Sequence, residues 1–93
     1  MIDLKDKTAL EFHFADHFDT ALFPVLADIY LQTGDLRRAK KVCEIGLGYT
    51  PDNKDGLYTL AKVHLVGGNL KNAENVLKTL LINTYIVIQN IMK

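Results

Sequence analysis

The sequence predicts an all-α protein built as a right-handed stack of antiparallel helix hairpins, an α-solenoid. Two observations predict this fold: the sequence repeats with a period of 34 residues, and both copies carry apolar residues at helical spacing. A fixed period of this length is typical of arrays in which each helical unit packs on its neighbours. Aligning residues 20–47 with residues 54–81 gives eight identical pairs: Leu26/Leu60, Ala27/Ala61, Leu31/Leu65, Gly34/Gly68, Leu36/Leu70, Ala39/Ala73, Val42/Val76 and Leu47/Leu81.

Each unit contains two apolar stripes that are separated by a glycine. From Phe23 to Tyr30, apolar residues follow the i, i+3, i+4, i+7 spacing of one helix face, and a second stripe follows Gly34. Glycine takes the left-handed conformation that ends many helices, and Asp35 can cap the helix that follows. Gly68 and Asn69 repeat this pattern in the second unit. The sequence therefore predicts helices over residues 20–33, 35–49, 53–66 and 69–82.

The whole chain reads as one domain of 93 residues with capping segments at both ends. A short helix from Thr8 to His17 is expected to cover the first unit. The predicted divisions are a capping segment at 1–19, repeat 1 at 20–53, repeat 2 at 54–87 and a final segment at 88–93.

The final segment has two possible structures. The repeat register and a β-branched run favour a break near Asn83 and Thr84, which would make 88–93 the start of a truncated third repeat. Against a break, no Gly or Pro follows Gly68, and apolar residues at 3-4 spacing continue to Ile91, as in one long helix. The sequence leaves both alternatives open, and with them the question whether this chain is a piece of a longer protein.

The residue pattern of each unit resembles the tetratricopeptide repeat. Small residues stand at the eighth and twentieth positions, an aromatic at the eleventh and a proline near the end of the first unit. The residues that meet the repeat spacing are Phe23, Leu26, Ala27, Tyr30, Ala39, Cys43 and Pro51. The departures are Phe23 in place of Trp, Cys43 in place of Phe, Gly46 in place of Ala, His64 in place of Tyr, and Tyr85 in place of the terminal Pro.

The resemblance implies a non-catalytic scaffold for protein–protein interaction. In such arrays the first helices of successive units line a concave groove that holds a peptide or a helix. Members that bind a C-terminal carboxylate use Lys, Asn and Arg, but Pro24, Asp28 and Thr59 occupy the matching positions, so that ligand class is not expected. The implied groove is mostly apolar: Val25, Asp28, Leu31, Gln32, Tyr58, Lys62, Leu65 and Val66.

A second hypothesis is self-association through the C-terminal helix. Residues 80–92 are rich in large apolar side chains, and either helix geometry leaves part of them exposed. An exposed apolar patch of this kind predicts a homodimer, most simply with two-fold symmetry. The residues expected to carry it are Leu81, Tyr85, Ile88, Ile91 and Met92.

Composition argues against nucleic-acid and membrane partners. Lys plus Arg and Asp plus Glu number 11 each, so there is no net charge to attract a polyanion, and an RNA-binding helical repeat is a distant alternative. The apolar run at 80–92 is shorter than the ~20 residues that span a bilayer. The charged N-terminal residues are unlike a signal peptide, and a single cysteine is compatible with a reducing compartment. We expect a soluble, cytoplasmic protein.

The sequence contains no convincing set of catalytic or metal-binding residues. His13 and His17 stand one helical turn apart, but no third ligand is evident. His64 and Cys43 occupy core positions of their units, and residues 37–41 form a basic cluster expected to face solvent. We find no nucleophile–base pair, and therefore expect no enzyme activity, no cofactor and no metal.

Overall fold

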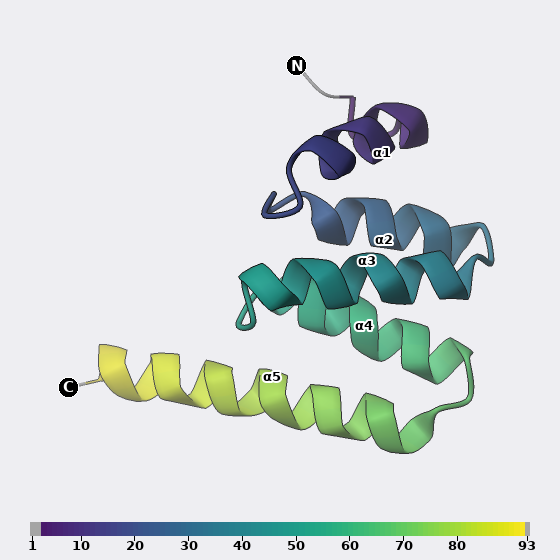
Figure 1. Ribbon diagram of the computed structural model, residues 1–93. Coiled ribbons are helices and arrows are strands. Elements are labelled where there is room, and N and C mark those ends of the chain that lie inside the picture. The colour runs from purple at the N-terminus through teal and green to yellow at the C-terminus, as the bar shows by residue number, and fades with distance from the viewer. Residues whose placement is uncertain (1–2, 93) are drawn as a thin grey trace.

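The computed structural model describes residues 3–92, and none of these residues lies in a strand. Each helix packs on the next one along the chain, and α2 also packs on α4, so that two helix hairpins stack side by side (Figure 1). The all-α fold and the hairpin stack are therefore confirmed. Residues 1–2 of the predicted capping segment, and residue 93, lie outside the described range. The helices are α1 (Lys7–Asp16), α2 (Phe23–Gln32), α3 (Leu36–Tyr49), α4 (Lys54–Val66) and α5 (Leu70–Ile91).

The turns inside the two hairpins have the predicted glycine chemistry. Gly34 and Gly68 have φ angles of 81° and 79°. The residue after each glycine donates its backbone N–H to a carbonyl in the preceding helix, Asp35 to Tyr30 and Asn69 to His64, both at 2.8 Å. These bonds satisfy carbonyls that the end of a helix leaves free. The Asp35 side chain also caps α3, whereas Asn69 makes no side-chain cap bond, so the capping prediction is right for the first unit only.

The helix of the first repeat starts later than the sequence pattern predicts. We expected it from residue 20, but α2 begins at Phe23, with Pro24 in its first turn. The Thr20 hydroxyl accepts from the Leu22 N–H at 3.2 Å and lies 2.8 Å from His13 Nε2, which holds Thr20 in the connection after α1. Local side-chain bonds of this kind compete with helix formation.

The core of the stack is centred on Phe23, which is 1% exposed. Its ring lies against Gly46 of α3 and Gly56 of α4 so closely that a Cβ on either glycine would overlap it. This contact explains why Gly46 stands where the repeat signature has alanine. Ala27 and Ala39, both 0% exposed, allow the helices of the first hairpin to approach closely, as their positions in the repeat predict.

The last helix is continuous over 22 residues, so the break favoured near residues 83–84 is wrong. At the position where the first unit has Pro51, the second unit has Tyr85, which keeps a backbone N–H and continues the helix. α5 packs on α4. Its buried residue, Ala73, and its half-buried residues, Val76, Leu80, Asn83 and Thr84, all precede Tyr85. The second part of α5 extends past the other helices (Figure 1). We call residues 81–92 the arm.

Candidate functional site

The predicted groove residues come from α2 and α4, and four of them form one connected network. Asp28 and Lys62 are exactly one repeat apart, and their side chains form an ion pair with a distance of 3.0 Å between Nζ and Oδ1. Gln32 Nε2 donates to the other Asp28 oxygen at 2.9 Å. The Lys62 ammonium also lies 5.0 Å from the centre of the Tyr58 ring, within cation–π range.

The other four predicted residues lie within one helical turn of this network. Val25 and Leu31 flank Asp28 on α2 and are half-buried. Leu65 and Val66 follow Lys62 on α4 and are 50% and 65% exposed. We call these eight predicted residues the α2–α4 face. Its only acid and only base neutralise each other, and apart from Gln32 the remaining side chains are apolar or aromatic. Its use as a binding site stays a prediction.

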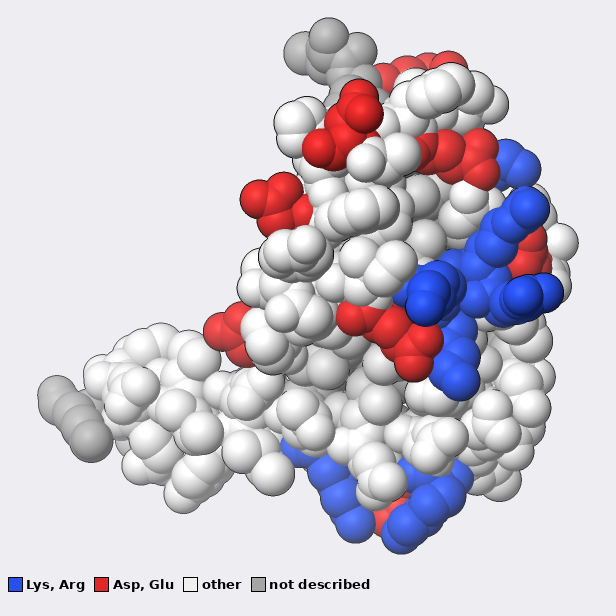
Figure 2. Space-filling model, in the orientation of Figure 1, with Lys and Arg blue, Asp and Glu red and all other residues white. Residues whose placement is uncertain are grey.

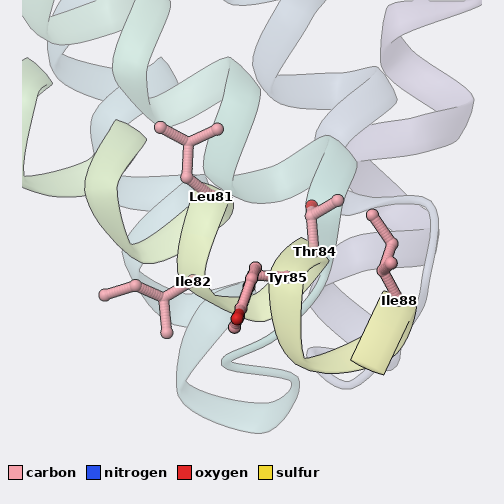
Figure 3. A pocket seen from close by; sticks show the side chains of 5 residues that line it. All are labelled: Leu81, Ile82, Thr84, Tyr85 and Ile88. Carbon is pink, nitrogen blue, oxygen red and sulfur yellow. The ribbon is translucent and has the colours of Figure 1, made fainter. Parts of the chain in front are cut away.

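The five predicted self-association residues all lie on the arm, and all are exposed. A shallow hollow of about 470 Å³ is lined entirely by α5, and Figure 3 shows the side chains that line it. Two of its lining residues, Ile82 and Thr84, were not among the predicted residues. The helical spacing of both residues to predicted ones could have indicated them: Thr84 lies three residues after Leu81, and Ile82 lies three residues before Tyr85. The five lining residues are Leu81, Ile82, Thr84, Tyr85 and Ile88. No helix within residues 3–92 is long and apolar enough to cross a membrane.

The basic cluster forms a second, polar hollow on α3. Arg37, Arg38, Lys40 and Lys41 surround it together with Glu44, and Figure 2 shows basic side chains gathered on this side of the molecule. All five are exposed. Arg38 also pairs with the helix-capping Asp35 at 3.4 Å. These side chains face solvent, as the sequence predicts.

Cys43 of α3 and His64 of α4 are titratable groups that are buried in the stack. Cys43 is 0% exposed, and burial raises the pKa of its thiol to about 12, which keeps it protonated and a poor nucleophile. His64 is 6% exposed, and its Nδ1 has no hydrogen-bond partner among the described residues. Burial, and after it the charge of Lys40, hold the pKa of His64 below its ordinary value of 6.5. Both residues occupy the core positions that the sequence predicts.

Two polar contacts connect α1 to the first repeat. The Tyr30 hydroxyl donates to the Glu11 carboxylate, and burial, followed by this carboxylate, raises the pKa of Tyr30 to about 12. His13 contacts Thr20, and its ring centre lies 5.1 Å from that of His17. Within residues 3–92, no three His, Cys, Asp or Glu side chains are close enough together to hold a metal ion.

A comparison with protein families matches residues 30–84 to the tetratricopeptide repeat. The match spans more than half of the chain, so the chain belongs to the tetratricopeptide repeat family. The resemblance of the repeat pattern is thereby confirmed. Members of this family are generally protein–protein interaction modules and are typically non-catalytic. Comparisons with curated proteins and with solved structures gave no match.

Proposed function

We propose that this protein is a non-catalytic scaffold that binds a peptide or a helix of a partner protein on the α2–α4 face. The observation that supports it is the ion pair between Asp28 and Lys62, which lie at equivalent positions of the two repeats. The pair joins α2 to α4 and leaves neither charge free. A ligand with few charges and several apolar side chains fits such a surface best.

The exposed side chains of α4 provide most of the binding energy in this proposal. Tyr58 is 55% exposed and Leu65 50% exposed, and they lie on either side of Lys62 along the helix. Aromatic residues surrounded by apolar contacts are often the strongest contributors to protein interfaces. A carboxylate or basic ligand would have to break the Asp28–Lys62 pair, so strongly charged peptides should bind more weakly.

The test begins with selection of binders from a displayed library of random peptides. The affinity of a selected peptide is then measured for the wild type and for two double variants. We expect Tyr58→Ala with Leu65→Ala to weaken binding at least tenfold, because it removes the largest apolar surfaces. The control, Arg38→Ala with Lys41→Ala, changes the α3 surface and should stay within twofold of the wild type.

Two results would contradict the α2–α4 face as the binding site. One is a selected peptide whose binding is lost only in the Arg38→Ala, Lys41→Ala variant, which would place the site on α3. The other is a library from which no peptide is enriched over many rounds. A salt-sensitive preference for acidic peptides or RNA would likewise point to the basic cluster instead.

The second candidate function is assembly through the arm, which the exposed apolar side chains of α5 support. The arm and the α2–α4 face are formed by different residues, so one molecule can use both. The proposal includes a cytoplasmic location, supported by the free and buried thiol of Cys43.

A further inference from the structure

The arm is apolar around most of its circumference. At 100° per residue, its large apolar side chains lie on several sides of the helix, and the polar residues among them are Asn83, Thr84, Gln89 and Asn90. A helix that is apolar all round is normally buried. Eight large apolar side chains of the arm are instead between 44% and 78% exposed: Leu81, Ile82, Tyr85, Ile86, Val87, Ile88, Ile91 and Met92.

The arm also carries no charge. From Thr79 to Met92 there is no Asp, Glu, Lys or Arg, and Figure 2 shows this part of the molecule free of charged side chains. A charged surface placed against it would lose its hydration and gain no ion pair. The matching occupant is therefore apolar and uncharged. The arm of a second copy has both properties.

The exposed apolar area of the arm is large. The eight side chains expose on the order of 1,000 Å² around the helix, and a partner helix would bury the part that faces it. A typical monomer has no apolar patch larger than ~600 Å².

The shape of the arm favours a partner with the same surface. Leu81, Thr84, Ile88 and Ile91 are spaced 3, 4 and 3 residues apart, the spacing with which two helices interdigitate side chains. Leu81, Thr84 and Ile88 of this stripe also line the hollow of Figure 3. Exposed side chains beside the hollow could fill the same hollow on a second copy. A surface that supplies both hollow and filling side chains is self-complementary, which is the requirement for a two-fold interface.

We propose that two copies of this chain pair arm to arm, antiparallel, about a two-fold axis near Tyr85. In this arrangement the free end of each arm, at Met92, lies beside Leu77 of the other copy, which is 36% exposed. A parallel pairing would instead place each Met92 beside Met92 of the other copy. The dimer uses a surface separate from the α2–α4 face, so it does not depend on the proposed peptide binding.

The first test is the mass of the full chain in solution, measured by light scattering and sedimentation from low to high micromolar concentration. We expect the mass to rise with concentration to twice the 10.5 kDa of one chain and to stop there. A strict monomer at high micromolar concentration would overturn the pairing. A mass that rises above that of a dimer would contradict a closed two-fold pair.

Charged substitutions locate the interface. Leu81→Glu and Ile88→Glu should each weaken the dimer at least tenfold, because the pairing would bury an unpaired carboxylate. The matched control is Phe12→Glu on α1, where the phenylalanine is 71% exposed and off the arm; it should stay within twofold of the wild type. Unchanged circular dichroism at low concentration shows that each variant still folds. If both arm variants dimerise as strongly as the wild type, the arm is not the interface.

Cysteine substitutions distinguish the geometry, because Cys43 is buried and does not compete. Tyr85→Cys, near the axis, should form a disulfide-linked dimer under mild oxidation. Met92→Cys should not, because its two copies would lie about 21 Å apart along the helices. A Met92→Cys dimer would show parallel pairing and overturn the arrangement. Co-sedimentation of the wild-type chain, as a monomer, with phosphatidylcholine vesicles would instead make a membrane the occupant of the arm.

Discussion

The two repeats are similar in sequence but end differently. The second helix of the first unit, α3, ends at Tyr49, and Thr50 leaves helical geometry ahead of Pro51. The second helix of the second unit, α5, passes the equivalent residue, Tyr85, without a break. Among the described helices, α3 contacts both α2 and α4, whereas α5 contacts α4 alone. The apolar pattern specifies the hairpins, but the proline specifies where a unit ends.

The two units also differ at their eleventh position. In the first unit, the Tyr30 hydroxyl donates to Glu11 of the helix before it. In the second unit His64 takes the same place, and Ile45 of α3 stands 34 residues after Glu11, where it offers no acceptor. The imidazole is buried, and its Nδ1 is unpaired within residues 3–92. The same repeat position thus holds a hydrogen-bonded hydroxyl in the first unit and a buried, titratable imidazole in the second.

The largest expected effect comes from giving the second unit the ending of the first. Tyr85→Pro should cost about 3 kcal/mol of helix stability in α5, since proline removes a hydrogen bond and clashes with the preceding turn. Far-ultraviolet circular dichroism should show less helix than in the wild type. Tyr85→Ala is the control, because it removes the ring but keeps the helix. Equal helicity of the two variants would mean that α5 is already broken there.

The close packing of Phe23 predicts opposite effects for two glycines of one helix. Gly46→Ala should destabilise the protein by about 1–3 kcal/mol, because the new Cβ overlaps the Phe23 ring. Gly48→Ala meets no atom within 4 Å and should stabilise α3 by up to about 1 kcal/mol. Urea denaturation of both variants measures the difference. Equal free energies of unfolding would show that the ring does not lie against Gly46.

His64 predicts a loss of stability in acid. Its folded pKa lies below its ordinary value of 6.5, so the unfolded chain takes up a proton first as the pH falls. The free energy of unfolding should therefore decrease below about pH 6.5 and level off below the folded pKa. Lys40 adds to the lowering, and Glu44 opposes it.

His64→Phe should make the stability less dependent on pH over this range, because phenylalanine does not titrate. The control is Gly48→Ala, which changes an exposed position on α3 without removing or adding a titratable group and should keep the wild-type pH dependence. Thermal melts between pH 7 and pH 5 measure both. The same acid sensitivity in His64→Phe as in the wild type would assign it to other groups.

The smallest expected effect concerns the ion pair between Asp28 and Lys62, which joins the two repeats. A double-mutant cycle with Asp28→Asn and Lys62→Gln should give a coupling of about 0.5 kcal/mol, since both side chains are about one-third exposed and screened by water. The coupling should fall in high salt. A coupling above about 2 kcal/mol that is insensitive to salt would mean that the pair is buried by something other than these helices.

The helices and turns could be predicted because they depend on local patterns: apolar spacing, Gly34 and Gly68, and the cap at Asp35. The Asp28–Lys62 ion pair could not be predicted in this way, because it depends on the distance between α2 and α4. The 34-residue separation of Asp28 and Lys62 was nevertheless a signal that the two residues could lie side by side. The start of α2 was missed because Thr20 bonds to His13 and lies in the connection after α1, which the local sequence pattern does not show. The continuity of α5 was missed because the repeat register and the β-branched run both favoured a break, whereas Tyr85 in place of proline allows the helix to continue.

The measurement that tests the difference between the two repeats most directly is the set of backbone Cα chemical shifts in nuclear magnetic resonance. We expect helical shifts to continue without interruption from Leu70 through Asn83, Thr84 and Tyr85, while Thr50 shows a non-helical shift. Non-helical shifts at residues 83–85 followed by a second helical segment would contradict this result. They would mean that the second unit turns like the first and that the arm folds back on its own chain.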